Sequence, residues 1–160
     1  MKICVCSDSH GNREGLMRLL ALEKPDGLLF CGDGADDFGG VTLPAKTMFV
    51  AGNCDFFSKE PLTRELVWEG VRIFMTHGHR YSLEKGYMGI CREAHKRNAS
   101  IAVFGHSHLP VAEYCRGVLM LNPGSTSWPR QENRRPSYIV LELEDGRVLS
   151  CGIRYLEKKV

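Results

Sequence analysis

The sequence predicts a layered α/β fold in which a single domain spans residues 1–160. Three observations lead to this prediction. In the first 51 residues, apolar runs of strand length alternate with a helical segment, which is typical of α/β layers. Further strand-like runs, separated by turns, fill the second half of the chain. We find no internal repeat, low-complexity tract or linker that would divide the chain.

The N-terminal third gives the clearest element pattern. Leu16, Leu19 and Leu20 recur at helical spacing, and Pro25 with Gly27 ends the helix that they predict. The short apolar runs on either side predict buried strands, and a short helical stretch precedes the third of them. The elements expected here are strands at residues 3–7, 28–31 and 47–51 and a helix at about residues 13–23.

The remainder of the chain predicts mostly strands. Glu69-Gly70 is a two-residue turn between apolar runs and predicts a hairpin. Gly117 and Asp145-Gly146 supply further turns. The expected elements are strands at residues 66–68, 71–75, 101–104, 111–114, 118–121, 138–143 and 148–153, and a helix at residues 83–97 that tolerates Gly86 and Gly89.

Composition excludes several classes of protein. The chain is 43% hydrophobic and 25% charged, with a net charge of +2, so nothing indicates a nucleic-acid-binding surface. The N-terminal apolar run is too short for a signal peptide, and no run approaches the ~18 residues of a membrane span. The seven cysteines are odd in number and include no C-x-x-C pair. We therefore expect reduced thiols and a cytoplasmic protein that does not interact with membranes.

Polar residues able to bind a metal ion follow five of the apolar runs. Ligand sites of α/β sheets lie beyond the carboxyl ends of the strands, so we expect these side chains to converge on one edge. They are Asp8, Asp33, Asn53, His77 and His106.

Each of these motifs is weak evidence by itself. Asp8-Ser9-His10, Gly32-Asp33 and Gly52-Asn53 are each more often turns than ligand sites. Only His106 and His108, two imidazoles beside a glycine, are hard to assign to a turn. Together, however, the motifs form a consistent set of oxygen and nitrogen donors, which suits Mn, Fe, Zn, Ni or Co.

The order and spacing of these motifs resemble those of the calcineurin-like metallophosphoesterases. The short chain and the Asn122–Ser125 segment are similar to the small prokaryotic phosphodiesterases of that family. The matched motifs are Asp8-x-His10, Gly32-Asp33-x-x-Asp36, Gly52-Asn53, His77-Gly78 and Gly105-His106-x-His108, and with Asn122–Ser125 they cover most of the chain.

The resemblance implies a four-layer β-sandwich flanked by α-helices, with a binuclear metal site. Asp8, His10 and His108 would hold one ion, the other ion would be held by Asn53, His77 and His106, and Asp33 would bridge both. Manganese is the expected metal, with Ni, Co, Fe or Zn as options. The implied reaction is hydrolysis of small phosphodiesters by in-line attack of a metal-bridging hydroxide. Asp33, Asn53 and His77 would be catalytic, and Asn53 and His79 would contact the substrate.

The chain departs from the family pattern at Cys54. Many members have a histidine there, which is assigned as the proton donor to the leaving group. Three interpretations of Cys54 are open: it is a packed residue without a role in catalysis (a packed bystander), a redox-sensitive residue beside the metals, or a weak proton donor. His79 is either a replacement acid or a neighbour that shapes the pocket. Without a strong general acid, we expect a preference for diesters with good leaving groups.

Other polar and aromatic residues have more ordinary interpretations. Asp36 and Asp37 are expected to cap or solvate a short helix, and the 122–125 segment to support the rim of the site. Arg130, Arg134 and Arg135 are interpreted as a charged loop, although contact with a substrate phosphate is an alternative. Phe56 and Phe57 either line the pocket or pack.

Two alternative functions, a non-catalytic scaffold and a nuclease, and one oligomeric state, a homodimer, are also considered. The fold also serves as a scaffold subunit of the retromer coat, whose metal site is degraded, whereas this chain keeps all seven expected ligand types. A nuclease of the same superfamily usually has extra domains, which this chain does not offer. A homodimer is compatible with the sequence but is not indicated by it.

Overall fold

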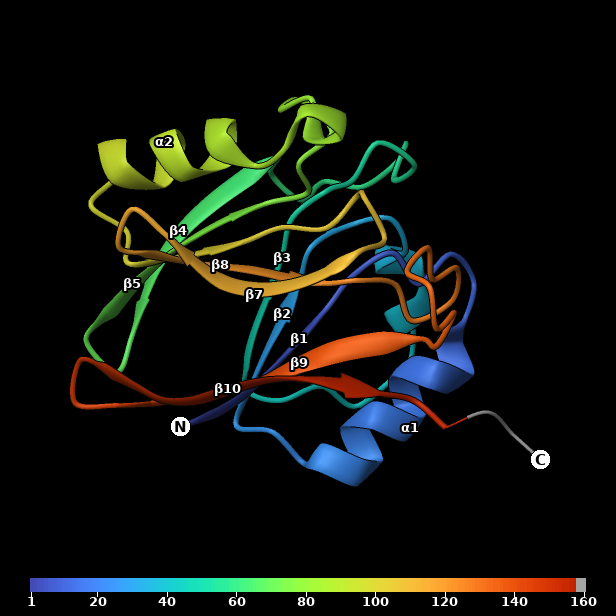
Figure 1. Cartoon of the computed structure of the whole chain (residues 1–160). Coiled ribbons are helices and arrows are strands. Elements are labelled where there is room, and N and C mark those ends of the chain that lie inside the picture. Colours follow the sequence, from blue (N-terminus) through green and yellow to red (C-terminus); the bar gives the residue numbers. More distant parts are fainter. Residues whose placement is uncertain (158–160) are drawn as a thin grey trace.

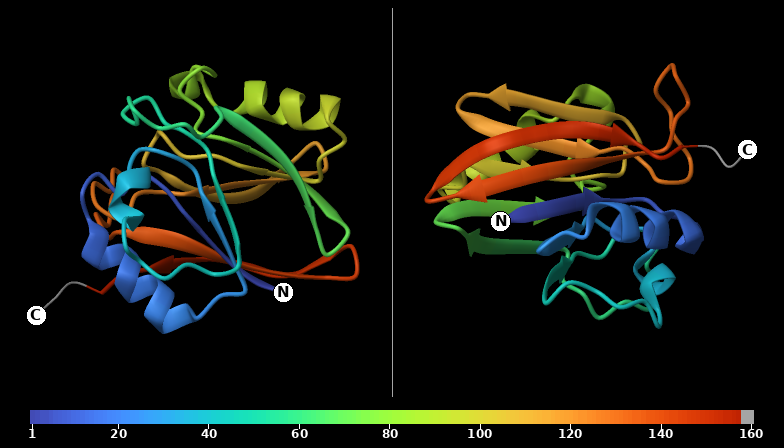
Figure 2. Two further views of the ribbon diagram at one scale, coloured as in Figure 1. Left: turned by 180° about the vertical axis from the view of Figure 1, so that it is seen from behind. Right: turned by 90° about the horizontal axis from the view of Figure 1, so that it is seen from below.

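Two five-stranded mixed sheets face one another in the computed structural model, which describes residues 1–157 (Figure 1). The first sheet has the order β10-β9-β1-β2-β3 and the second β4-β5-β6-β8-β7. Figure 2 shows helix α1 on the outer face of the first sheet and helix α2 on the outer face of the second. The four layers confirm the predicted fold class.

The first sheet combines a parallel half with an antiparallel half. β1 (Lys2–Cys6), β2 (Gly27–Phe30) and β3 (Lys46–Phe49) are parallel. Helix α1 (Arg13–Glu23) connects β1 to β2, and the 3₁₀ helix η1 (Ala35–Phe38) lies between β2 and β3. β9 (Ser137–Glu144) and β10 (Arg147–Tyr155) complete the sheet as an antiparallel hairpin beside β1.

The second sheet has a parallel centre and antiparallel edges. β5 (Val71–Thr76), β6 (Ile101–Val103) and β8 (Val118–Pro123) run parallel to one another. β4 (Thr63–Trp68) and β7 (Pro110–Cys115) are the antiparallel edges. Helix α2 (Met88–Lys96) connects β5 to β6.

Three apolar clusters hold the layers together. The largest lies between the sheets and contains Ile3, Val5, Ile73 and Ile139. The second packs Leu16 and Leu19 of α1 against the outer face of the first sheet, and the third packs Ile90 and Ala94 of α2 against the second sheet. Burial on both faces explains why the central strands are almost continuously apolar in sequence.

Helix α1 has the bounds that its sequence predicts. The Asn12 side chain caps its N-terminus by accepting from the Gly15 N–H at 3.0 Å. Lys24 ends the helix in the left-handed conformation, and its N–H donates to the Leu20 carbonyl. Leu16 and Leu19 occupy the buried face.

The predicted helix at residues 83–97 is wrong in its first third. The chain forms a single 3₁₀ turn, η2 (Leu83–Lys85), before α2 begins at Met88. Gly86 has φ 102°, which no α-helix accommodates, and therefore separates the two elements. β4 also begins earlier than predicted, at Thr63, because its polar first half is held by backbone pairing with β5 rather than by apolar burial.

Two further sequence-based expectations concern the whole chain. No helix within residues 1–157 is long and apolar enough to cross a membrane. The predicted single domain includes residues 158–160, which lie outside the described residues.

A buried carboxylate ties α1 to the first sheet. Glu23, at the end of α1, accepts from the Tyr138 hydroxyl at 2.7 Å and pairs with the Lys2 ammonium at 2.7 Å. Burial by itself raises the pKa of Glu23, but Lys2 and Tyr138 more than offset this, so its pKa lies below the ordinary value.

We expect this carboxylate to make part of the stability depend on pH. Because the pKa of Glu23 is lowered in the folded state, its contribution is present above the unfolded pKa and is lost as the pH falls through the folded value. Urea unfolding followed from pH 7 to well below pH 4, where a carboxylate with a lowered pKa becomes protonated, should show a smaller loss of stability in Glu23→Gln than in the wild type. Tyr138→Phe should cost about 1–2 kcal/mol at pH 7. Parallel pH curves for wild type and Glu23→Gln would contradict this role.

Candidate metal centre

The carboxyl ends of the parallel strands of both sheets open onto one edge of the sandwich. The segments that follow β1, β2, β3, β5 and β6 carry the residues expected to bind metal. Figure 1 shows the dark-blue, teal and orange loops gathered at this edge. The structure brings all seven predicted ligands to one place, although they are spread over 101 positions from Asp8 to His108.

Asp8, His10 and His108 form the first group of donors, in which all three ligand atoms lie within 4.8 Å of one another. Asp8 Oδ1 is 3.1 Å from His108 Nε2 and 3.7 Å from His10 Nε2. The two Nε2 atoms are 3.3 Å apart. This is a compact set of one oxygen and two nitrogens that suits a divalent ion.

Asp33, His77 and His106 form the second group of donors, also within 4.8 Å. His77 Nε2 is 3.3 Å from Asp33 Oδ2 and 3.0 Å from Asn53 Oδ1. Asp33 Oδ2 is also 3.7 Å from His10 Nε2 in the first group. The same carboxylate oxygen therefore faces both groups, as a bridging ligand must.

Each carboxylate has one oxygen anchored to the protein and the other directed at the donors. Asp8 Oδ2 accepts from the Ser7 hydroxyl at 2.5 Å and the His106 N–H at 3.0 Å. Asp8 Oδ1 is buried and has no hydrogen-bond partner within residues 1–157. Asp33 Oδ1 accepts from the Cys54 N–H at 2.8 Å, which leaves Oδ2 for the donor cluster.

Backbone carbonyls orient two of the imidazoles. His77 Nδ1 lies 2.6 Å from the Cys31 carbonyl and His108 Nδ1 lies 2.8 Å from the Trp128 carbonyl. Since a carbonyl only accepts, each Nδ1 carries the proton and each Nε2 lone pair faces the donor cluster. This is the arrangement that metal-binding histidines ordinarily have.

Five of the seven predicted ligands adopt a left-handed backbone. Such conformations are uncommon outside glycine and cluster at functional sites. They are Asp8 (φ 53°), His10 (38°), Asp33 (58°), His106 (65°) and His108 (59°).

Glycines at two positions let the loops approach these ligands. A Cβ at Gly52 would lie 2.0 Å from Asp33 Oδ1, and a Cβ at Gly105 would lie 2.6 Å from Asp8 Oδ2. Only a residue without a side chain fits at either place.

Two carboxylates that hold the loops were not recognised from the sequence. Asp55 accepts from the N–H groups of Asp33, Gly34, Ala35 and Gly52, and so ties together the loops after β2 and β3. Its place within the polar Gly52–Asp55 turn after a strand was the available signal.

Asp37 also holds a ligand-bearing loop in place, namely the loop that follows β1. Asp37 was expected to cap or solvate a short helix; instead it accepts from the Ser9 hydroxyl at 2.6 Å and the Gly11 N–H at 2.9 Å. It therefore braces the loop that carries Asp8 and His10. Asp36 is exposed on η1, in keeping with its interpretation.

The turn at residues 125–128 supports the whole first donor group. Ser125 Oγ donates to the Asp8 carbonyl at 2.7 Å and accepts from the Trp128 N–H at 2.7 Å. The Trp128 ring stacks on His10 at 4.4 Å between centroids, while its carbonyl orients His108. The predicted supporting role of the 122–125 segment thus extends to Trp128, which the sequence did not single out.

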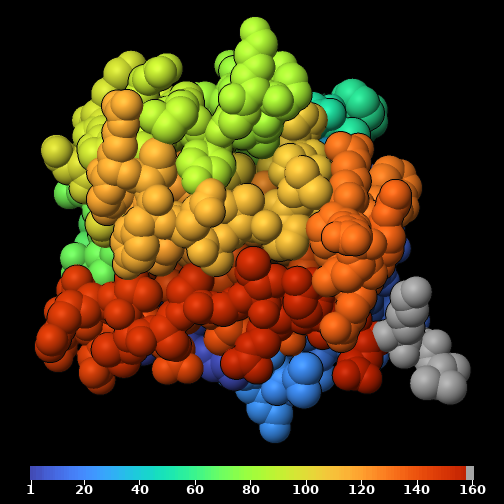
Figure 3. Space-filling view, viewed as in Figure 1, coloured from blue at the N-terminus to red at the C-terminus, as the bar shows by residue number. Residues whose placement is uncertain are grey.

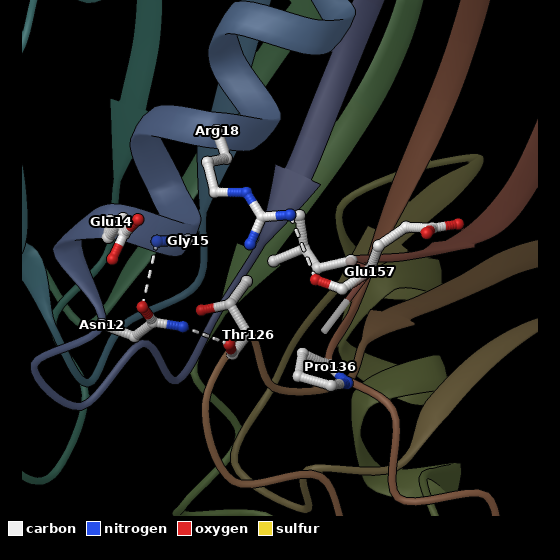
Figure 4. A pocket seen from close by; sticks show the side chains of 8 residues that line it. Asn12, Glu14, Gly15, Arg18, Thr126, Pro136 and Glu157 are labelled. Atoms are coloured by element: carbon white, nitrogen blue, oxygen red, sulfur yellow. Dashed lines mark hydrogen bonds between the residues drawn. The ribbon is translucent and has the colours of Figure 1, made fainter. Parts of the chain in front are cut away.

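A side chain from α1 connects to the same turn. Asn12 donates from Nδ2 to the Thr126 carbonyl at 2.7 Å while its Oδ1 caps the helix (Figure 4). The hollow drawn in Figure 4, about 230 Å³, lies beside this link and is lined by none of the predicted ligands.

The pKa values of the clustered carboxylates and imidazoles are shifted in the directions that stabilise negative carboxylates next to positive charge. Burial by itself raises the pKa of Asp8, but His10 and His108 bring it well below the ordinary value. Burial lowers the pKa of His77, but Asp33 raises it above the ordinary value. Without a cation, the carboxylates therefore favour protonation of His10 and His77, whose pKa values are raised, and a metal ion must compete with those protons.

The structure excludes some of the roles considered for the residues that surround the metal-binding side chains. Cys54 is exposed, so the packed-bystander reading is wrong, and its Sγ lies within 4.8 Å of donor atoms of His10 and Asp33. The His79 ring is tilted against His77 at 5.5 Å between centroids and edge-on to His106 at 6.3 Å, and burial, followed by the proximity of His77, lowers its pKa. Phe56 and Phe57 are 83% and 97% exposed and do not pack.

The residues present fit a pair of divalent cations. The two donor groups combine carboxylate, imidazole and amide ligands, and they share Asp33. A buried carboxylate oxygen without a partner, as at Asp8 Oδ1, is costly unless a cation occupies the space that it faces.

Comparison with known proteins agrees with this geometry. The family model of the calcineurin-like phosphoesterase superfamily domain matches residues 1–146. The probable metallophosphoesterase YsnB of Bacillus subtilis is 35% identical, over 91% of this chain and 86% of that protein. The phosphodiesterase YfcE of Escherichia coli is 31% identical, over 83% of each chain.

Solved structures share the fold. A "predicted phosphoesterase" from Streptococcus pneumoniae superposes with a TM-score of 0.81 at 27% identity, covering 96% of this chain and 88% of that one. Vps29 of Entamoeba histolytica, solved with Zn²⁺, gives a TM-score of 0.78 at 20% identity, covering 98% of each chain. At that identity, the likeness to Vps29 extends to the fold alone.

Replacing the bridging carboxylate should abolish metal loading. We expect Asp33→Asn to lose bound Mn²⁺, measured by elemental analysis after dialysis, because one neutral amide replaces the oxygen that faces both groups. Saturating Mn²⁺ at 100 times its Kd should stabilise the wild type by about 2.7 kcal/mol and this variant far less. Asp36→Asn, on the exposed face of η1, is the matched control. Equal loading of both variants would refute a bridging role for Asp33.

Removing the Trp128 ring should weaken one of the two ions selectively. Trp128→Ala keeps the carbonyl that orients His108 but frees the His10 ring, and losses of this kind cost about 10- to 100-fold in metal affinity. Trp128→Phe retains an aromatic ring and should lose less. A competition titration with a chelating dye measures the affinity of each ion. Unchanged affinities in the Ala variant would show that the stack does not position His10.

Proposed function

The chain belongs to the calcineurin-like phosphoesterase superfamily, and from that premise we propose that it is a phosphodiesterase that uses two divalent metal ions to hydrolyse small phosphodiesters. The observation that carries the proposal is the pair of donor groups joined by Asp33, with Asp8 Oδ1 buried and unpartnered at their centre. All seven donors keep the types that the family resemblance implies.

The proposed ligands divide as the family resemblance implies. Asp8, His10 and His108 would hold one ion, the other would be held by Asn53, His77 and His106, and Asp33 would bind both. When bound, two such ions supply a water of lowered pKa and positive charge for the phosphate oxygens. Manganese is the proposed metal, because oxygen and nitrogen donors without thiolate suit it.

The protein contributes rigidity and orientation to this reaction. The Cys31 and Trp128 carbonyls fix the imidazoles of His77 and His108 before substrate arrives, so little reorganisation is needed. The Asn53 side chain is exposed at the mouth of the site, with Oδ1 beside His77 and Nδ2 donating to Cys54 Sγ at 3.6 Å, and the second N–H of this amide is proposed to donate to a phosphate oxygen. His79, whose lowered pKa keeps it neutral, is proposed as a substrate contact.

The thiol at Cys54 accounts for the proposed preference for good leaving groups. Burial, and then the nearby Asp33 carboxylate, raises the pKa of Cys54, so the group remains a neutral thiol and a poor proton donor. A leaving group that departs as a stable anion needs no proton. We also propose a cytoplasmic location and, as the sequence allows, a homodimer.

The activity test is a comparison of esters on protein stripped of metal and reloaded with Mn²⁺. We expect hydrolysis of bis(p-nitrophenyl) phosphate to depend on added metal and to exceed that of p-nitrophenyl phosphate. A folded protein that binds metal but hydrolyses neither ester with Mn²⁺, Ni²⁺, Co²⁺ or Zn²⁺ would overturn the proposal and favour a scaffold role instead.

A histidine at position 54 should restore general-acid help. We expect Cys54→His to raise kcat for diesters with poor leaving groups by up to about 10², and to change little for p-nitrophenyl esters. Cys54→Ser is the control, because the backbone N–H at this position still donates to Asp33 Oδ1 while no imidazole is added. Brønsted plots of rate against leaving-group pKa make the comparison. An unchanged slope in Cys54→His would refute the missing-acid explanation.

A further inference from the structure

A second hollow adjoins the metal centre on the side of the second sheet. It has a volume of about 330 Å³ and is lined by Leu83, Glu84, His106, Ser107, Leu109 and Arg130. These residues come from η2, from the loop after β6 and from the loop after β8. His106 belongs both to this hollow and to the second donor group, so the hollow adjoins the proposed metal centre at this residue.

Two opposite charges line this hollow, and the residues that carry them are both exposed. Neither the Arg130 guanidinium nor the Glu84 carboxylate has a hydrogen-bond or ion-pair partner within residues 1–157. The backbone of Arg130 is nevertheless held in place, because its N–H donates to the His108 carbonyl at 3.3 Å. This bond links the loop after β8, which carries Arg130, to the loop after β6, which carries the proposed metal ligand His108.

Apart from His106, the other residues that line the hollow are apolar or form hydrogen bonds within the protein. Leu83 packs against the core of the second sheet, and Leu109 is 44% exposed. Ser107 Oγ accepts from Asn122 Nδ2 at 2.9 Å and from the Leu109 N–H at 3.3 Å, which leaves only its hydroxyl hydrogen for a ligand. Figure 3 shows the lime segment around η2, the gold chain entering β7 and the orange loop after β8 on one face of the molecule.

We propose that this hollow binds an ester substituent that carries both an ammonium and a carboxylate group, as an amino-acid alcohol such as serine does. A guanidinium pairs with a carboxylate, and a carboxylate accepts hydrogen bonds from an ammonium. A substituent bearing only one charge leaves one protein charge unmatched, and a neutral substituent leaves both. The inference rests on the proposed phosphodiesterase function and adds the class of substrate; because such esters leave as alkoxides, we expect slow turnover without a histidine at position 54.

Three diesters that differ only in one substituent test the proposal on the Mn²⁺-loaded protein. Glycerophosphoserine carries both charges, glycerophosphoethanolamine carries the ammonium alone, and glycerophosphoglycerol carries neither. We expect kcat/KM to fall in that order, with about three- to tenfold between the first two. Arg130→Gln should abolish the preference for serine over ethanolamine, and Glu84→Gln should abolish that for ethanolamine over glycerol.

Control variants distinguish the effect of charges that line this hollow from the effect of charges elsewhere on the surface. Arg134→Gln and Glu132→Gln alter exposed charges on the loop after β8 that do not line the hollow, and they should leave both preferences unchanged. Equal kcat/KM for the three diesters in the wild type, or a preference for serine that survives Arg130→Gln, would overturn the proposal.

A binding measurement keeps the result independent of turnover. Calorimetry on the metal-loaded protein should show tighter binding of O-phospho-L-serine than of O-phosphoethanolamine, and Arg130→Gln should equalise them. If no diester is hydrolysed, including bis(p-nitrophenyl) phosphate, the proposed function fails, and the calorimetry still decides the specificity of the hollow. Equal affinity of the wild type for the two monoesters would refute it.

Discussion

The rest of the site is arranged around the buried carboxylate of Asp8. Burying an ionised group is costly unless it is paired and hydrogen-bonded, so every neighbour of Asp8 is constrained. Ser7 and the His106 backbone hold one of its oxygens, and its carbonyl anchors Ser125. Its second oxygen has only imidazoles nearby. The protein thus keeps one negative charge oriented for a cation that the fold itself does not supply.

The strain of the ligand loops is offset by a layer of carboxylates and carbonyls behind them. Five left-handed residues in a small volume would favour other loop conformations if nothing held them. Asp55 holds four backbone N–H groups, Asp37 holds the loop after β1, and Ser125 connects that loop to the turn that carries Trp128. The result is a site whose donors are in position before any ligand binds, which is the condition for electrostatic catalysis.

Much of the fold could be predicted from the sequence because both sheets have parallel centres buried on two faces. Their strands are therefore apolar throughout, and helix α1 has clear caps and spacing. The errors occur where local backbone geometry or pairing outweighs apolar pattern. Gly86 interrupts the predicted helix, and the polar start of β4 is held only by its partner strand. Neither effect leaves a periodic apolar signal.

The sequence by itself determined which donor types are present and that they follow the strands, because the strand ends and the metal-binding side chains are local features of the chain. Only the tertiary structure decided which oxygen of Asp33 faces both groups, which carbonyls orient His77 and His108, and that Arg130 and Glu84 face one hollow. The physical reason is that hydrogen bonds and charge pairs depend on distances of a few ångströms between loops far apart in the chain. Such distances follow from the packing of the two sheets.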